Sequence, residues 1–178
     1  MGGLPIEMKT IALFGGGSLC ELDSVADVQL FFDCMKEFVA HKFPKQDWNI
    51  LTDRLYRRYL RMEELTSAET MMEQVKEVFA NVPNSAIDLS GITTPSAKTQ
   101  LDPNKITLAE IFSKYFEHFV HCKESAEINY KAFKSYPGYE YEPVKMVIAD
   151  MPEFMTDKKR PLEEYDALNG EPFWMRGK

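Results

Sequence analysis

The sequence predicts a protein of the α/β or α+β class, with about three helices packed on a small sheet. Three short apolar runs have the length of buried strands, and the segments between them carry helical period behind capping-box spacings. The chain has 178 residues, 44% of them hydrophobic, and a chain of this size buries a core of its own. We therefore expect a single domain over residues 1–178.

The N-terminal part predicts a strand, a turn and a helix in that order. Residues 10–14 form an apolar run that stops at the glycines 15–17, as a buried strand closed by a flexible turn does. Ser24 and Asp27 then have the spacing of a capping box, and apolar residues follow with helical period to about His41. An amphipathic helix is expected there.

The middle of the chain predicts a second strand and a second helix. Residues 48–52 are the next apolar run, and residues 53–60 mix both periods, so that a strand and a short helix are both open for them. Thr66 and Glu69 repeat the capping-box spacing, and the helix that they open ends before Pro83.

The second half begins with a long connection. Residues 83–105 are rich in Ser, Thr, Asn and Pro, which predicts irregular structure of the kind that is often functional. Thr107 and Glu110 have capping-box spacing again and open a third helix that extends towards Phe133. Residues 144–148 are the last strand candidate.

The net charge indicates which classes of partner the protein can bind. Asp and Glu number 28 against 21 Lys and Arg, for a net charge of -7, which repels nucleic acid and anionic membranes and favours a basic protein partner. Solubility alone is the open alternative reason for such a balance. No apolar run reaches the ~18 residues of a membrane span, so that we expect a cytoplasmic protein, with residues 1–7 as a leader or cloning remnant before Met8.

Two segments suggest chemistry, and both are better explained by structure. The run Gly15 to Ser18 is similar to a phosphate-binding loop, but neither a GxGxxG nor a Gly-Lys pattern is present, and a structural turn is favoured. His118, His121 and Cys122 have helical spacing, yet only His118 and Cys122 converge, without a second ligand cluster. We expect no metal, no cofactor, no catalytic residue and no enzyme.

The cysteines and arginines also have plain explanations. Three widely spaced cysteines fit neither a disulfide framework nor a metal knuckle, which predicts reduced thiols. The basic cluster between residues 54 and 61 is interleaved with tyrosines, as nucleic-acid patches are. Because the rest of the chain is acidic, internal pairing with Glu63 and Glu64 is the favoured interpretation. The cluster consists of Arg54, Arg57, Arg58 and Arg61.

The C-terminal third carries the predicted partner-binding surface. Its aromatic rings are candidate desolvated anchors, and its carboxylates are candidate partners for Lys and Arg. The open alternative is that Tyr165, Phe173 and Trp174 pin the tail to the core. The predicted binding residues are Glu140, Glu142, Asp157, Glu163, Glu164, Tyr165, Asp166, Glu171 and Trp174.

Residues 51–59, 63–65, 159–168 and 172–174 together resemble bacterial immunity proteins of contact-dependent growth inhibition and related polymorphic toxin systems. The resemblance implies a cytoplasmic protein that binds a cognate toxin domain, often a nuclease, and covers its basic active-site or substrate groove. It implies no catalytic residue and leaves the oligomeric state open. Two alternatives remain: a small phosphate- or metal-binding enzyme that uses residues 15–18 or His118 and Cys122, and a regulatory interaction domain.

Overall fold

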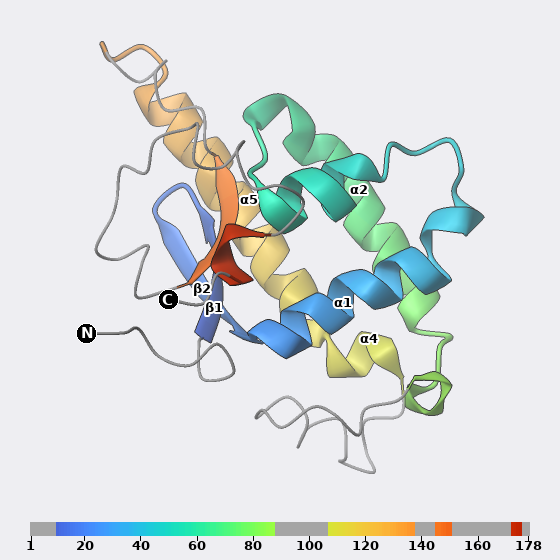
Figure 1. The fold of residues 1–178 in the computed structure, drawn as a ribbon. Helices are drawn as coiled ribbons and strands as arrows, with labels where there is room; N and C mark the ends of the chain where they lie inside the picture. The colour runs from blue at the N-terminus through green and yellow to red at the C-terminus, as the bar shows by residue number, and fades with distance from the viewer. Residues whose placement is uncertain (1–9, 88–106, 138–144, 151–171, 176–178) are drawn as a thin grey trace.

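The computed structural model describes residues 10–87, 107–137, 145–150 and 172–175, and these form an α+β fold (Figure 1). The sheet has three antiparallel strands in the order β2-β1-β3. Its strands are β1 (Thr10–Gly15), β2 (Ser18–Ser24) and β3 (Met146–Asp150). The predicted small sheet with about three main helices is confirmed.

Strands β1 and β2 form a tight hairpin. Gly15 pairs with Ser18, which places Gly16 and Gly17 at the tip, and Gly16 has a φ of 57° that favours glycine. The predicted first strand is confirmed, but β2 was not predicted, because its apolar positions are too few to form a run. Its pattern is instead an alternation in which Leu19 and Glu21 are exposed.

Helix α1 (Val25–Phe38) begins where the sequence predicts. The hydroxyl of Ser24 accepts a hydrogen bond from the backbone N–H of Asp27 at 3.3 Å, which caps the helix. The chain continues as the short 3₁₀ helix η2 (Ala40–Lys42), so that helical structure ends close to the expected His41. Both boundaries follow from local interactions.

The predicted strand over residues 48–52 is wrong, because this run enters the π-helix η3 (Ile50–Leu55). The hydroxyl and the backbone N–H of Thr52 both bond the carbonyl of Trp48, which closes a helical turn. Leu51 and Leu55 are buried on one side of that turn. The period of a short apolar run does not distinguish a strand from a buried helix. For residues 53–60 a short helix was one of the two alternatives, and η3 extends into the first of these residues.

Helix α2 (Met62–Phe79) begins earlier than predicted. The carboxylate of Glu64 accepts a hydrogen bond from the backbone N–H of Arg61 at 3.1 Å, which starts the helix there. Thr66 and Glu69 therefore lie inside the helix, and their capping-box spacing is a coincidence. The predicted end before Pro83 is confirmed.

The third predicted helix is present in two pieces, α4 (Leu108–Ile111) and α5 (Ser113–Phe133), separated at Phe112. The hydroxyl of Thr107 accepts from the N–H of Glu110 at 3.3 Å, which confirms the predicted cap. The long connection is described only at its start, where Asn84–Ala86 forms the 3₁₀ turn η4, and the rest of it lies outside the described residues.

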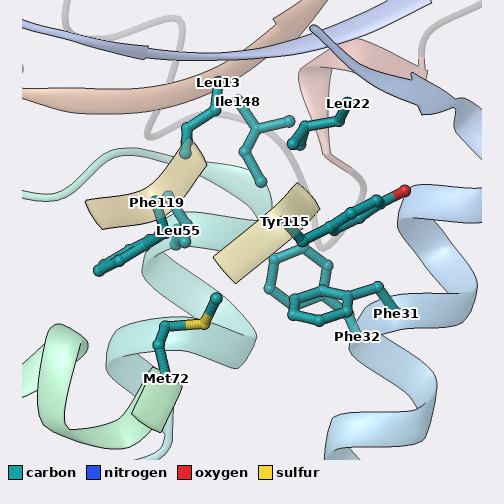
Figure 2. A pocket seen from close by; sticks show the side chains of 9 residues that line it. All are labelled: Leu13, Leu22, Phe31, Phe32, Leu55, Met72, Tyr115, Phe119 and Ile148. Carbon is teal, nitrogen blue, oxygen red and sulfur yellow. The ribbon is translucent and has the colours of Figure 1, made fainter. Parts of the chain in front are cut away.

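The core lies between the sheet and the helices. Side chains of all three strands point towards α1, α2 and α5, and the Phe31 ring contacts several other rings at their centre (Figure 2). An apolar cavity of about 20 Å³ remains there. Such a volume holds about one water molecule, so that it is a packing gap and not a ligand site. Its lining residues are Leu13, Leu22, Phe31, Phe32, Leu55, Met72, Tyr115, Phe119 and Ile148.

Candidate functional site

The seam between the β1–β2 hairpin and α5 brings together both segments for which the sequence suggests chemistry. A Cβ atom added to Gly15 would lie 2.3 Å from the carbonyl oxygen of Cys122, and one added to Gly16 would lie 2.3 Å from that of Ser125. No side chain fits at such distances. The two glycines therefore allow the hairpin to lie directly on the helix backbone.

The glycine turn does not have the geometry of a phosphate loop. It leads into strand β2 and not into a helix, so that no helix N-terminus faces it. The N–H of Gly17 already donates to Ser125 Oγ at 3.2 Å. The interpretation as a structural turn agrees with this arrangement.

The same seam pairs a serine with a histidine. Ser18 Oγ and His121 Nε2 lie 3.2 Å apart, in a hydrogen bond that joins β2 to α5. Nucleophilic catalysis also requires a group that orients the histidine, and within the described residues no carboxylate bonds the other ring nitrogen of His121. The pair was not predicted from the sequence. The signal that could have suggested it is the alternation of β2, which turns Ser18 and Cys20 to the same side of the strand.

The metal site considered for α5 does not form among the described residues. Cys122 is fully buried, and its thiol lies 3.5 Å from the carbonyl oxygen of Leu13. Burial, followed by the charge of Lys114, lowers the pKa of His118. In the part of the chain that the structure describes, no group of three or more His, Cys, Asp or Glu side chains could hold a metal ion.

A second polar cluster, which the sequence analysis did not predict, lies where β2, α1 and α5 meet. Asp23 is buried and accepts from Lys114 Nζ at 2.7 Å and from the hydroxyl of Tyr115 at 3.1 Å. Asp27 is fully buried at the start of α1 and accepts from Ser24 Oγ at 2.7 Å. Both oxygens of the Asp23 carboxylate are bonded in this way, which is what keeps a buried carboxylate stable. The bonds to Asp23 therefore fasten α5 to the end of β2, directly before α1.

We expect Tyr115→Phe to lower the free energy of unfolding by about 1–2 kcal/mol near neutral pH, because Asp23 loses a donor. Burial, followed by the charges of Asp23 and Asp27, raises the pKa of Tyr115 well above its usual value. The folded protein thus keeps the phenol protonated above pH ~10, where the unfolded chain releases the proton. This contribution is complete below pH ~10 and is lost as the pH rises further, by up to ~1.4 kcal/mol per pH unit.

Urea unfolding of both proteins over an alkaline pH series measures this effect. The stability difference between the wild type and Tyr115→Phe should narrow above pH ~10, because only the wild type loses the contribution. A difference that stayed constant with pH would show that the phenol is not held protonated by Asp23 and Asp27.

The arginine cluster is engaged internally. Arg54 Nε lies 2.8 Å from Glu64, and Arg57 forms an ion pair with Asp53. Arg61 Nη2 donates to the hydroxyl of Tyr59 at 3.1 Å. The predicted internal pairing is confirmed for Arg54 with Glu64.

One face of α2 presents carboxylates to the solvent. Glu63, Glu73 and Glu77 are exposed, as are Thr66 and Thr70 between them. At 3.6 residues per turn these positions fall within about 80° of the helix circumference and extend over about 20 Å. The exposed Lys76, one helical turn from Glu73, borders this face. We call it the acidic face of α2.

All predicted partner-binding residues except Trp174 lie outside the described residues: Glu140, Glu142, Asp157, Glu163, Glu164, Tyr165, Asp166 and Glu171. Trp174, in the 3₁₀ helix η6 (Phe173–Met175), is fully buried, and its Nε1 donates to the carbonyl oxygen of Tyr56 at 2.8 Å. The alternative interpretation therefore applies to Trp174, which anchors its segment in the core and offers no surface to a partner.

Comparison with known protein families, with curated proteins and with solved structures found no match. Among the described residues, no helix is long and apolar enough to cross a membrane.

Proposed function

We propose that this protein binds a basic protein in the cytoplasm and neutralises it, as an immunity protein does with its toxin domain. The supporting observation is the way in which charges are distributed. Arg54, Arg57 and Lys123 each bond carboxylates of the same chain, whereas the acidic face of α2 points into the solvent. A partner therefore meets the carboxylates of that face, with Lys76, the cation of α2, at its edge.

Such a surface has a physical advantage against a nuclease-like partner. An enzyme that binds phosphates presents a positive groove, and a carboxylate-rich protein is attracted to it over the range of a Debye length. With a net charge of -7 the attraction speeds association, and it weakens as the salt concentration rises. Aromatic anchors would add affinity after the first encounter.

The direct test is co-expression with the toxin domain encoded by the neighbouring reading frame. We expect growth to be rescued and the two proteins to purify as one complex. The association rate of that complex should fall steeply between low and high salt. If neither rescue nor a complex is obtained, the proposal is wrong.

Charge reversal locates the surface that makes the contact. One variant combines Glu163→Lys with Glu164→Lys in the predicted C-terminal surface, and a second combines Glu73→Lys with Glu77→Lys on the acidic face of α2. A third, Glu117→Lys with Glu124→Lys on α5, changes the net charge equally and is the control. We expect one of the first two to slow association about 10-fold or more and the control to have a much smaller effect.

The control separates a specific surface from a general effect of charge. If all three variants slow association equally, only the net charge acts, and no acidic surface of this protein is a binding site. Circular dichroism of each variant verifies that the fold is retained.

A further inference from the structure

Two cysteines face each other across the hairpin–α5 seam. Cys20 on β2 pairs with Leu13 on β1, and cross-strand partners project to the same face of a sheet. Leu13 faces the helices and lines the core cavity (Figure 2). Cys20 therefore also faces the helices, in line with its lower exposure than that of Leu19 and Glu21 on either side of it.

Cys122 reaches the same place from α5. Its sulfur lies 3.5 Å from the carbonyl oxygen of Leu13, the residue opposite Cys20. Both cysteines therefore lie beside Leu13, one across the strand pair and one from the helix. Both are free thiols in this structure.

The backbones at this seam are close enough for a covalent link. A Cβ added to Gly15 would lie 2.8 Å from the Cβ of Cys122, so that no side chain fits between β1 and α5 at this position. A disulfide requires Cα atoms about 4.4–6.8 Å apart, so that it can form only where backbones lie in direct contact, as the hairpin and α5 do here. Glycine at position 15 thus allows β1 to lie against α5 at Cys122.

We propose that Cys20 and Cys122 form a reversible disulfide when the protein meets a peroxide, which makes this seam a site of thiol oxidation. Hydrogen peroxide oxidises the partly exposed Cys20 thiol to a sulfenic acid, with release of one water. The sulfur of Cys122 then attacks the Cys20 sulfur, the S–O bond breaks, and a second water leaves as the S–S bond forms. Two thiols are oxidised and one peroxide is reduced.

The burial of Cys122 sets the order of these steps. Burial raises the pKa of the Cys122 thiol, which makes it a poor first target for an oxidant. Cys20 is only partly buried and is reached first. The third cysteine, Cys34, is buried on α1, and burial raises its pKa to about 12. It therefore serves as the control cysteine in the test of this proposal.

The disulfide would fasten the hairpin to α5 and close a loop of ~100 residues. Restricting the unfolded chain in this way raises the midpoint of thermal unfolding, here by about 10 °C. This inference does not depend on the proposed partner binding, and the two are tested by separate experiments.

The test treats the reduced full-length protein with hydrogen peroxide, then alkylates all remaining thiols under denaturing conditions and maps the peptides by mass spectrometry. We expect Cys34 alone to be alkylated and a peptide linked through Cys20 and Cys122, which dithiothreitol separates again. Cys20→Ser should abolish the link and the rise in the unfolding midpoint, and Cys34→Ala should retain both.

Other outcomes would overturn the inference. One is alkylation of all three cysteines after the peroxide treatment. Another is oxidation of Cys20 beyond the sulfenic acid, with Cys122 recovered in its alkylated form. A third is a disulfide between two chains through Cys20. Because the partly exposed Cys20→Ser disturbs the fold less than a change at the buried Cys122, the comparison does not rely on a variant that fails to fold.

Discussion

Gly15→Ala is expected to lower the free energy of unfolding by about 3 kcal/mol or more. The added methyl group would lie 2.3 Å from the carbonyl oxygen of Cys122, which belongs to the backbone in the middle of α5. Unlike the end of a flexible side chain, this atom moves only if the helix moves. The hairpin and α5 must therefore separate, and the bonds across the seam between Ser18 and His121 are weakened with them.

Gly17→Ala is the matched control in the same turn. A Cβ at Gly17 meets nothing within 4 Å, and the residue does not have a positive φ. We expect a change of less than ~0.5 kcal/mol. Chemical denaturation of both variants measures the difference. Equal losses of unfolding free energy in the two variants would mean that the conformational entropy of glycine, and not the close approach of Gly15 to α5, causes the effect.

Trp174→Ala is expected to cost about 3–5 kcal/mol of stability. The indole is fully buried, its N–H bonds the carbonyl of Tyr56, and its ring meets the Tyr56 ring edge-on at 5.6 Å. Tyr56 in turn packs against Phe32 of α1 at 5.0 Å. Removing the indole leaves a cavity and removes the hydrogen bond to the Tyr56 carbonyl, so that thermal and urea unfolding should both shift strongly.

The same variant distinguishes a core role from a binding role. As a core residue, Trp174 contributes to folding, and the folded fraction of Trp174→Ala should bind a partner with unchanged affinity. The partly buried Trp48, which bonds the carbonyl of Phe43, is the comparison, and Trp48→Ala should cost about half as much. Normal stability of Trp174→Ala together with lost binding would contradict the structure at this position.

Elements with local causes were predictable. Ser24 and Thr107 each bond a backbone N–H only three residues away, so that the spacing in the sequence already contains the interaction. The strand at residues 10–14 is also local, because it is buried on both faces and forms an unbroken apolar run. The fold class was predicted from these elements together with the other apolar runs and helical segments, and it is correct although the run 48–52 is not a strand.

Elements selected by packing were not predictable. Residues 48–52 have strand-like composition but form helical turns, because the burial of Leu51 and Leu55 decides between two locally similar choices. The spacing of Thr66 and Glu69 is a valid cap that the chain does not use, since Glu64 starts the helix earlier. Strand β2 owes its existence to its pairing with β1.

The sequence by itself determined the helix caps at Ser24 and Thr107, the first strand, the class of the fold and the excess of negative charge, all of which depend on composition or on neighbours within a few residues. Only the tertiary structure decided that Gly15 lies on α5, that Tyr115 bonds Asp23 and that the Cys122 thiol lies against Leu13, opposite Cys20. These contacts join residues that are far apart along the chain. They form because burying the apolar faces of the sheet and helices forces the remaining side chains together, and no short-range pattern encodes the outcome.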